Sequence, residues 1–465
     1  MFLDSHCHLD DPAFDDDRDE VIRRAAEAGL RYLLTIGTDP ISAQKALALA
    51  ESFDFIYAAA AVHPHDAASV DNGALAAFRE FYSHPKMIGV GETGLDFYYD
   101  NSPREQQERV FRHFLRLALE LDMPVIIHLR DPKDGPPLAR ERFFSILDEE
   151  CPAKIKGIMH CFTGGYDFAM QCIERGLMIS IPGVVTFPKA EDLRDAVSRL
   201  PYRKLLVETD CPYLAPVPKR GKRNEPAFIE HTAQKVTELK NITHADLDRI
   251  LAYNFETLFG LGERGPQQED NIAYEIRGNL YLNLTNRCTC NCSFCDRTRG
   301  ATVSGYHLGL RREPEAAELI AAVGDPKRFR QIVFCGYGEP TIRLETLKET
   351  ARELKARGAV IRLNTNGHGE LIHGRDILPE LFGLVDLISV SLNAANAEDY
   401  VRLCLPDHGE QAFEAVKSFI RRSAELGFET TASAVELPGR DPEPIRRLAE
   451  SLGAKFRTRF YNVVG

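Results

Sequence analysis

The stretch Asn286-Arg287-Cys288-Thr289-Cys290-Asn291-Cys292-Ser293-Phe294-Cys295 places four of the chain's 11 cysteines within eight residues. Cys288, Cys292 and Cys295 have C-x3-C-x2-C spacing, so their thiolates can converge on one inorganic centre from a single loop. Zinc usually takes four ligands, often as two separated pairs, and no second pair follows at short distance. We therefore favour a four-iron cluster over a zinc knot or a group of buried cysteines. Three thiolates on such a cluster leave one iron open to a small chelating molecule.

The length of 465 residues is too great for one ordinary domain and indicates two or three. The net charge of −12 argues against broad adhesion to nucleic acid or anionic membranes, although a local basic patch is still permitted. No apolar run approaches the roughly 18 residues of a membrane helix, and the N-terminus lacks the basic start and apolar stretch of a signal peptide. The odd number of clustered cysteines fits a reducing compartment better than a disulfide framework. We expect a cytoplasmic protein without membrane contact.

In the first part of the chain, up to Gly262, short apolar runs alternate with stretches of helical character. The candidate strands are Phe2-Leu3, Tyr32-Thr35, Phe55-Val62, Met87-Gly91, Val125-His128, Ile155-His160, Met178-Ile181 and Leu205-Glu208. This rhythm over roughly 250 residues predicts an α/β fold, a (β/α)8 TIM barrel. A doubly wound open sheet is the competing arrangement.

Polar side chains follow or close these apolar runs. They are His6, His8, His63, His65, Glu92, His128, His160 and Asp210. Because all strand ends of a barrel open on one face, we expect these groups to gather there as a catalytic site. Imidazole and carboxylate together suit zinc, manganese or a similar divalent ion, and a carboxylate can bridge two ions.

The motifs that carry these residues resemble the TatD-type metal-dependent hydrolases. They are Asp4-Ser5-His6-Cys7-His8-Leu9-Asp10, Val62-His63-Pro64-His65, Gly91-Glu92-Thr93-Gly94-Leu95-Asp96, Pro124-Val125-Ile126-Ile127-His128, His160-Cys161-Phe162-Thr163-Gly164 and Glu208-Thr209-Asp210-Cys211-Pro212-Tyr213-Leu214. The resemblance covers the first 260 or so residues and implies a barrel of the amidohydrolase-like class. It also implies metal-dependent DNase activity, often exonucleolytic, with DNA as the substrate.

The resemblance also implies a role for each polar residue. His6 and His8 would hold one divalent ion (zinc, manganese or magnesium), His128 and His160 would hold a second, and Glu92 would bridge them. Asp210 would ligate the first ion and take the proton of the attacking water, as a general base beside both can do. We expect His63 and His65 to contact the scissile phosphate rather than the metals.

Two further stretches concern the substrate. Pro218-Lys219-Arg220-Gly221-Lys222-Arg223-Asn224 sets four cations into five positions after the last strand, where barrels commonly bind phosphate. We predict that Lys219, Arg220, Lys222 and Arg223 contact phosphate, although such a run is often only a solvated face. Phe97, Tyr98 and Tyr99 could stack on bases or belong to the core.

A polar segment with Gly265 and Pro266 reads as a linker over residues 263–270. It separates a hydrolase domain over residues 1–262 from a second domain over residues 271–465. The candidate strands of the second domain are Leu280-Leu284, Ile332-Phe334, Val360-Asn364, Leu387-Leu392, Glu429-Ala434 and Ala454-Phe456. About six strand–helix units are too few for an eight-stranded barrel and predict a partial (β/α)6 barrel.

The second domain resembles the radical S-adenosylmethionine enzymes, whose signature is the spacing of Cys288, Cys292 and Cys295 with Phe294 before the last cysteine. Gly336-Tyr337-Gly338-Glu339-Pro340 stands where that family has its glycine–glutamate motif, with Tyr337 in place of a glycine. Asn364-Thr365-Asn366-Gly367 and the segment from Ser389 to Asn393, which includes Ser391, match its ribose and pocket segments. Cys290 receives no ligand role.

This resemblance implies a [4Fe-4S] cluster, bound S-adenosylmethionine near Gly336, Gly338, Glu339, Asn364 and Ser391, a 5′-deoxyadenosyl radical, and an external reductant. Only Cys335 and Cys404 follow the cluster loop, too few for a second cluster. The leading interpretation is a fusion of a two-metal phosphodiesterase with a radical enzyme of unknown substrate, without a predicted protein partner. The alternatives are a barrel that hydrolyses another ester or amide, and a cluster that acts as a redox sensor.

Overall fold

A computed structural model of the chain describes residues 2–151, 153–261, 270–295, 302–437 and 439–460. It divides into two compact units, Met1–Arg264 and Gly265–Gly465, each with its own apolar core. Except for Asp270, the predicted linker lies outside the described residues. No helix in the described ranges is both long and apolar enough to span a membrane.

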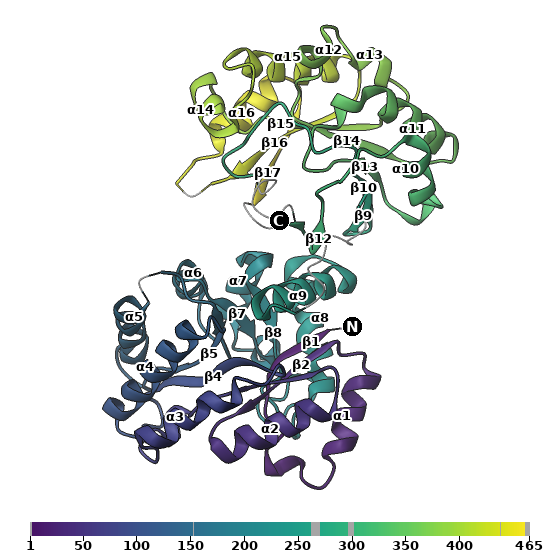
Figure 1. Cartoon of the computed structure of the whole chain (residues 1–465). Coiled ribbons are helices and arrows are strands. Elements are labelled where there is room, and N and C mark those ends of the chain that lie inside the picture. The colour runs from purple at the N-terminus through teal and green to yellow at the C-terminus, as the bar shows by residue number, and fades with distance from the viewer. Residues whose placement is uncertain (1, 152, 262–269, 296–301, 438, 461–465) are drawn as a thin grey trace. The chain divides into compact units, whose positions relative to one another are not determined.

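The first unit is a nearly closed parallel barrel whose strands neighbour one another in sequence order, β1 to β8 (Figure 1). The strands are β1 (Leu3–Cys7), β2 (Tyr32–Gly37), β3 (Ile56–Ala60), β4 (Met87–Asp96), β5 (Val125–Arg130), β6 (Gly157–Met159), β7 (Met178–Ile181) and β8 (Leu205–Val207). The sequential order confirms the predicted barrel and excludes the doubly wound sheet, in which the strand order reverses. Ser5 Oγ donates to Val207 O (3.0 Å) and links β1 to β8.

Helices surround this barrel. They are α1 (Arg18–Glu27), α2 (Pro40–Ser52), α3 (Asn72–Phe81), α4 (Arg104–Glu120), α5 (Leu138–Glu150), α6 (Tyr166–Glu174), α7 (Glu191–Arg199), α8 (Ile229–Lys240) and α9 (His244–Phe259). In α4, Val110, Phe111 and Phe114 recur at helical spacing on one buried face. Thr243 and Asp246 form a capping box that fixes the start of α9.

Only β7 has its predicted bounds, and the two largest differences are in β4 and β1. β4 continues to Asp96 instead of ending at Gly91, and every one of its residues is buried. β1 begins at Leu3 and runs to Cys7, so His6 lies inside the strand and only His8 follows it. Glu92 is likewise part of a strand. The predicted ends were too early because buried polar residues interrupt the apolar pattern that marks a strand in sequence.

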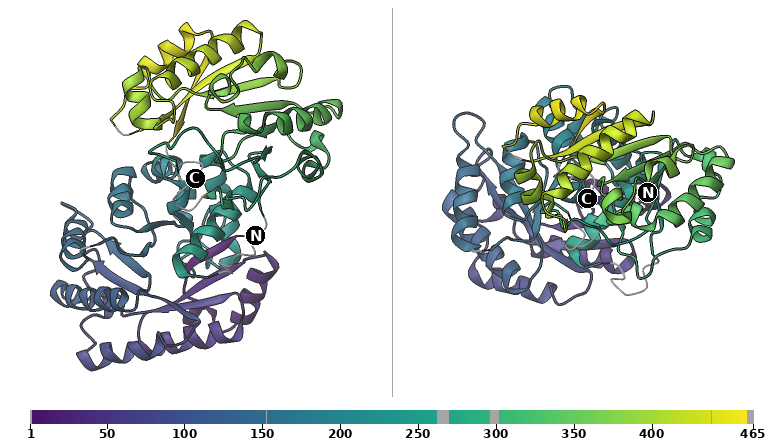
Figure 2. Two further views of the ribbon diagram at one scale, coloured as in Figure 1. Left: turned by 45° about the horizontal axis from the view of Figure 1, so that its top comes forward. Right: turned by 90° about the horizontal axis from the view of Figure 1, so that it is seen from above.

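The second unit, green to yellow in Figure 2, contains an open sheet. Its strand order is β17-β16-β15-β14-β13-β10-β9. Its strands are β9 (Ala273–Ile276), β10 (Asn279–Leu282), β13 (Ile332–Phe334), β14 (Ile361–Thr365), β15 (Leu387–Ser391), β16 (Glu429–Glu436) and β17 (Lys455–Phe460). From β10 to β17 all pairs are parallel, as predicted for a partial barrel. The antiparallel edge strand β9 and the small hairpin of β11 (Thr302–Val303) and β12 (Tyr306–His307) were not predicted.

Helices pack on one face of this sheet and leave the other face to the cysteine loop. They are α10 (Ala316–Val323), α11 (Leu344–Ala356), α12 (Gly369–His373), α13 (Leu378–Leu381), α14 (Ala397–Cys404), α15 (Gln411–Glu425) and α16 (Glu443–Ser451). Side chains of successive strand residues point to opposite faces. Ile361 and Leu363 of β14 therefore join the core under the helices, whereas Asn364 lines a cavity on the other side.

Candidate functional site

The barrel gathers four imidazoles and two carboxylates at the carboxyl ends of its strands. They come from β1 and the residue after it, from β4 and β5, and from the segments after β6 and β8: His6, His8, Glu92, His128, His160 and Asp210. His6, Glu92 and His160 are nearly fully buried. The structure thus brings together every residue that the sequence suggested as a metal ligand.

Glu92 lies at the centre of this group, with its two oxygens facing different imidazoles. Its Oε2 is 3.3 Å from His6 Nε2 and 3.7 Å from His8 Nε2. Its Oε1 is 2.7 Å from His128 Nδ1 and 2.8 Å from His160 Nε2. A carboxylate placed in this way can bridge two cations, each with its own pair of imidazoles.

Asp210 faces the first of these pairs. Its Oδ1 lies 3.6 Å from His8 Nε2 and 3.8 Å from His6 Nε2. Its backbone has a φ of 55°, a left-handed conformation that is uncommon for a residue with a side chain. The Asp210 amide donates to His6 O (3.0 Å), which ties the segment after β8 to β1. The turn therefore directs the Asp210 carboxylate toward the two histidines.

The charges in this group are strongly coupled. Burial disfavours ionisation of Glu92, but the charges of His160, His63 and His6 hold its pKa well below the ordinary value. Burial also opposes protonation of His160, yet the negative charges of Glu92 and Glu208 raise its pKa well above the usual range. Burying imidazoles and carboxylates costs free energy when no cation neutralises the carboxylates. Nδ1 of His6 also has no hydrogen-bond partner among the described residues. Divalent cations therefore suit this donor set.

The second unit places its cysteine loop beside a cavity of about 310 Å³. The backbone of the loop pairs with the end of α14, because Asn291 N donates to Cys404 O (3.1 Å) and Ser293 N donates to Leu403 O (2.9 Å). The sequence-predicted cluster and cosubstrate residues all line this cavity: Cys288, Cys292, Cys295, Gly336, Gly338, Glu339, Asn364 and Ser391. Thiols and cosubstrate residues thus meet in one place, as a cluster with an open iron requires.

Three more cysteines line the same cavity: Cys290, Cys335 and Cys404. Cys290 and Cys404 are buried. Hydrogen bonds from the thiols of Cys290 and Cys404 lower the pKa of Cys292 to about 4. Only the thiolate form binds iron, so these neighbours favour the form of Cys292 that a cluster needs.

Glu339 holds the cavity wall in place. Its Oε1 accepts hydrogen bonds from Thr341 Oγ1 and Thr365 Oγ1 (both 2.7 Å), and its Oε2 accepts one from the Asn366 amide (2.7 Å). The carboxylate also caps the 3-10 helix Pro340–Arg343 through Thr341 N. Because both of its oxygens accept hydrogen bonds inside the protein, the Glu339 side chain fixes the segments that follow β13 and β14.

Gly336 and Gly338 allow close packing of the chain against itself. A Cβ on Gly336 would lie 2.1 Å from Asn283 Oδ1, and a Cβ on Gly338 would lie 2.1 Å from Thr285 O. The glycines therefore let the loop after β13 approach the segment that leads into the cysteine loop. The resemblance to radical enzymes had implied only that Gly336 and Gly338 lie near bound S-adenosylmethionine.

Comparison with known proteins gives a family match for each of the two units. The family model of TatD-related DNases matches residues 3–260, more than half of the chain. The chain belongs to the TatD-related DNase family. The model of the radical SAM superfamily matches residues 282–452, and the second unit of this TatD-family chain is a radical SAM domain. The cofactors are thus metal ions for the hydrolase half, and a [4Fe-4S] cluster with S-adenosylmethionine for the radical half.

Relatives of the TatD half include bacterial hydrolases. The uncharacterized metal-dependent hydrolase YabD of Bacillus subtilis is 39% identical over 259 residues, which are 56% of this chain and 99% of YabD. The 3′-5′ ssDNA/RNA exonuclease TatD of Escherichia fergusonii is 36% identical over 264 residues, again 56% of this chain and 99% of the relative. The crystal structure of the TatD homologue YjjV from Escherichia coli has a TM-score of 0.52 and 30% identity, covering 56% of this chain and 98% of YjjV.

His63 and His65 occupy different positions in the TatD-family site. His63 Nε2 is 3.5 Å from Glu92 Oε1, so His63, Glu92 and His128 form a group with metal-ligand spacing. His65 Nε2 lies 3.0 Å from Asp96 Oδ2, farther toward the rim. Burial lowers the pKa of His63 to about 4. His63 is therefore neutral at pH 7 and could accept a proton, bind a metal or contact a phosphate.

Two carboxylates in the TatD motifs were overlooked in the sequence. Asp96 Oδ2 is 3.1 Å from His128 Nε2, and Glu208 Oε1 is 3.4 Å from His160 Nδ1. Each carboxylate thus orients a ring whose other nitrogen faces Glu92, an arrangement common around metal-binding histidines. Their closeness in sequence to predicted ligands could have revealed both carboxylates, since Asp96 ends the Glu92 motif and Glu208 precedes Asp210 by two positions.

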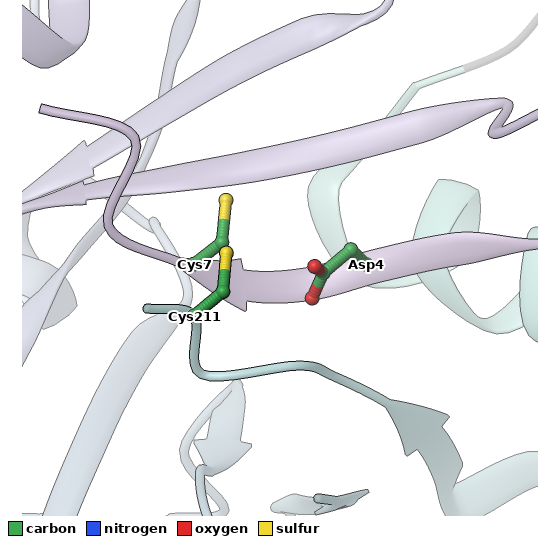
Figure 3. Close-up of side chains that lie close together, drawn as sticks. All are labelled: Asp4, Cys7 and Cys211. Atoms are coloured by element: carbon green, nitrogen blue, oxygen red, sulfur yellow. The ribbon is translucent and has the colours of Figure 1, made fainter. Parts of the chain in front are cut away.

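A buried pair of thiols, those of Cys7 and Cys211, lies near the Asp4 carboxylate in the TatD barrel (Figure 3). Cys7 ends β1, Cys211 follows Asp210, and ligand atoms of both lie within 4.8 Å of the Asp4 carboxylate. Asp4 accepts hydrogen bonds from the Thr209 amide (2.9 Å) and hydroxyl (2.5 Å). Burial raises the pKa of Asp4 to about 8. This cluster closes the seam between β1 and β8 beneath the site.

The four cationic residues of the segment after β8 are not equivalent. They are Lys219, Arg220, Lys222 and Arg223. Arg223 donates to both oxygens of Asp17 (2.7 and 2.6 Å) and to Ala13 O. Arg220 lies over the ring of Phe187, 3.9 Å from its centroid, and Lys219 over that of Phe228. Lys222 is exposed. Arg223 is therefore held by the scaffold, while the other three are better placed to reach a ligand.

Of the three consecutive aromatic residues after the Glu92 motif, one belongs to the core and two lie on the surface. Phe97 is buried, whereas Tyr98 and Tyr99 are 38% and 53% exposed. The Arg130 guanidinium lies over both tyrosine rings, 4.3 and 4.9 Å from their centroids, and the Tyr99 ring meets that of His65 edge to face. Tyr98, Tyr99 and Arg130 form a cationic aromatic surface next to the site, of the kind that can hold nucleobases and phosphates.

Proposed function

We propose that the barrel cleaves phosphodiester bonds in single-stranded DNA or RNA, as an exonuclease. The observation that carries the proposal is Glu92, whose two oxygens face separate imidazole pairs. His6 and His8 would hold one divalent cation, His128 and His160 the other, with Glu92 between them. Such a pair of cations activates water and neutralises charge on a phosphoryl group.

The protein's own groups complete the reaction. Asp210 would ligate the first cation and accept the proton of the attacking water, because it lies within 3.8 Å of the His6 and His8 ring nitrogens. Tyr98, Tyr99 and Arg130 would hold the bases, while Lys219, Arg220 and Lys222 would bind phosphates away from the bond that breaks. The exonuclease name of the Escherichia fergusonii relative supports the choice of substrate.

Cleavage of a labelled single-stranded oligonucleotide by Asp210→Asn tests this proposal. We expect the rate to fall by at least about a hundredfold, because the base and a metal ligand are lost together. Asp195→Asn, on the surface of α7, should cleave like the wild type. Undiminished cleavage by Asp210→Asn would disprove the role of this site. Hydrolysis of carboxylic esters or amides without cleavage of the oligonucleotide would favour the alternative substrate class.

We also propose that Cys288, Cys292 and Cys295 hold the [4Fe-4S] cluster of the radical half. The cosubstrate would lie along Gly336, Gly338, Asn364 and Ser391, which share the cavity with these thiols. A reduced cluster of this class cleaves S-adenosylmethionine to a 5′-deoxyadenosyl radical that abstracts hydrogen. The protein's part is to orient the cosubstrate and to keep other reactants out of the cavity.

Anaerobic reconstitution followed by measurement of iron and of 5′-deoxyadenosine tests the ligand set. Cys292→Ala should lose both the cluster and the cleavage of S-adenosylmethionine. Cys290→Ala is the matched control two residues away: it removes a hydrogen bond to Cys292 but no proposed iron ligand, so it should keep the cluster. Full iron loading of Cys292→Ala would refute the ligand assignment, and a stable cluster without binding of S-adenosylmethionine would favour a redox sensor.

A further inference from the structure

Large apolar and aromatic side chains on the surface of the barrel gather in two segments at its mouth. The described part of the first unit exposes eight such side chains, and five of them lie in these segments. They are Tyr98 and Tyr99 after β4, and Tyr213, Leu214 and Val217 after β8. Apolar residues on a protein surface are usually scattered. Their concentration beside the candidate metal site indicates that they contact a ligand there.

The two segments lie on opposite sides of the mouth. The eight strands of the barrel follow one another in sequence order, and Ser5 of β1 donates to Val207 of β8 across the closure. β4 and β8 are therefore four strands apart in either direction around the ring, which is the greatest separation that eight strands allow. Because Tyr99 follows β4 and Tyr213 follows β8, their rings belong to opposite walls of the mouth.

Each ring adjoins a different half of the candidate metal site. The Tyr213 ring meets that of His8 edge to face, with 6.2 Å between the ring centroids, and His8 belongs to the first pair of imidazoles. The Tyr99 ring meets that of His65 edge to face at 5.5 Å. The His65 ring in turn lies 6.3 Å from that of His128, which belongs to the second pair. The proposed pair of cations therefore lies between the two tyrosines.

Tyr213 is exposed and is also held in place. Its hydroxyl donates to Asp11 Oδ2 (2.9 Å), and its amide donates to Asp210 O (2.9 Å). The buried Asn224 side chain donates to Tyr213 O (2.7 Å) and to Thr209 O (2.8 Å), which fixes the turn that carries the ring. Tyr213 is nevertheless 54% exposed. A ring that is fixed before binding can stack on a ligand with little loss of conformational entropy.

The chemistry of the Tyr213 wall suits a nucleotide. Leu214 and Val217 add exposed apolar surface beside the ring, and Lys222 of the same segment is exposed. Every base has an aromatic face that stacks on tyrosine whatever the sequence, and a lysine ammonium attracts the phosphate next to it. A phosphorylated ligand without a base would use the cation and leave the ring uncovered. A nucleobase is therefore the ligand that this wall fits.

We propose that opposite walls of the mouth hold the bases on the two sides of the bond that breaks, one base on Tyr213 and the other on Tyr98 and Tyr99. The inference rests on the proposed nuclease activity and adds the Tyr213 subsite to it. A strand bound in this way crosses the mouth with its scissile phosphate at the metal pair. Two neighbouring bases that are drawn to opposite walls must unstack from each other, which favours a single strand over a duplex.

Single abasic sites in a labelled strand test the proposal, with kcat/KM for the first bond cleaved by the full chain in the presence of manganese. An exonuclease first cuts between the terminal and the penultimate nucleotide, so strands that lack one of these two bases are compared with the intact strand. Tyr213→Ala should lower kcat/KM on the intact strand by at least about fivefold, as the loss of one base stack does. It should cleave one abasic strand like the wild type, because the base that Tyr213 holds is missing there, and remain impaired on the other.

The opposite wall should give the reverse pattern. The double variant Tyr98→Ala/Tyr99→Ala should match the wild type only on the abasic strand that Tyr213→Ala cleaves poorly. Tyr213→Phe keeps the ring and should retain most of the wild-type kcat/KM. Leu119→Ala, which removes an exposed apolar side chain near the end of α4, is the matched control and should cleave all three strands normally. Metal content and far-ultraviolet circular dichroism establish that each variant is loaded and folded.

Three results would overturn the proposal. The first is unchanged cleavage of the intact strand by Tyr213→Ala. The second is an equal loss on all three strands, because the effect of Tyr213 would then not pass through a base. The third is a dependence of Tyr213→Ala and of the double variant on the same base, which would exclude opposite walls.

A binding measurement separates this proposal from the proposed activity. Fluorescence anisotropy with the metal-free chain should show that Tyr213→Ala weakens binding of an intact strand but not of a strand made of abasic sites. If the wild type binds in this way but cleaves no strand, the proposed activity is wrong and the Tyr213 subsite stands. If the wild type cleaves the strand and neither cleavage nor binding depends on Tyr213, the activity stands and the subsite is wrong.

Discussion

At the scale of single residues, Glu208 acts on the barrel site through its neighbours. It accepts a hydrogen bond from the Cys161 amide (2.5 Å) and lies 3.4 Å from His160 Nδ1. Glu208→Gln should weaken metal affinity by about 10- to 100-fold, the usual effect of losing such a carboxylate. Excess metal should restore cleavage, which a defect in chemistry alone would not allow. Glu230→Gln, on the surface of α8, is the control.

Protons occupy the metal-binding groups when no metal is present, and this predicts a pH dependence. Burial opposes protonation of His8, but its hydrogen bond to the Asp210 carboxylate and the charge of Glu92 raise its pKa to about 9. The pKa values of His128 and His160 are also raised, against the effect of burial, by the carboxylates beside them. His8 is therefore charged at pH 7 and must lose a proton to bind a metal, and the raised pKa values of His128 and His160 favour their charged forms.

Metal affinity should therefore rise as the pH increases from 6 toward 9 and fall as the solution becomes more acidic. Calorimetric titration of the metal-free protein at pH 7, in buffers of different ionisation enthalpy, should show that metal binding releases protons. A binding heat that is the same in every buffer would contradict this expectation.

At the scale of single elements, the loop after β13 depends on Gly338. A Cβ at this position would meet the carbonyl oxygens of Thr285 and Arg287, at 2.1 and 2.6 Å. Gly338→Ala should destabilise the second unit by about 1–3 kcal/mol, as overpacking does, and should lower iron content because Arg287 precedes the cluster loop. Gly409 has a φ of 55° and open space around it. Gly409→Ala should cost about 1 kcal/mol and leave iron content unchanged.

The basic segment after β8 should divide into a binding part and a structural part. Removing the charge of Lys222 should reduce the slope of log affinity against log salt by about one, since each phosphate contact releases counterions. Arg223→Gln should leave that slope unchanged, because Arg223 is paired with Asp17. Equal slopes for wild type and Lys222→Gln in a titration with single-stranded DNA would show that this segment is only a solvated surface.

At the scale of the whole molecule, the two units have separate cores and different metal chemistry. Soft thiolates favour iron clusters, whereas imidazole and carboxylate favour zinc or manganese. A fragment that starts near Glu269 should therefore fold, take up one four-iron cluster and cleave S-adenosylmethionine slowly on reduction. Glu92→Gln should leave the cluster of the full chain intact. A fragment that binds zinc in place of iron would contradict the prediction.

The course of both sheets could be predicted because buried parallel strands are apolar runs in sequence. The predicted strand Ile332-Phe334 has the same bounds as β13, and Leu387-Leu392 differs from β15 by one residue. The edge strand β9 was missed because its alternating exposure leaves only a short and weak apolar pattern. β4 was predicted too short because Glu92 and Thr93 are buried for reasons of function rather than hydrophobicity.

The candidate metal ligands could be predicted because they end or follow strands whose positions the apolar runs reveal. Their partners could not be predicted in the same way. Arg223 meets Asp17 across a separation of 206 residues, and no local pattern indicates that pair.

The barrel can close between β1 and β8 only after the ribosome has made the chain that separates the two strands. The hydrogen bonds between Asp4 and Thr209 join residues 205 positions apart. At about 5–20 residues per second, the ribosome needs roughly 10–40 s to make the intervening chain. During that time His6 and His8 have been synthesised, but the metal site to which they belong is still incomplete. The barrel can then close and take up its cations before the loop of Cys288 has left the ribosome, so each half can acquire its own inorganic cofactor in turn.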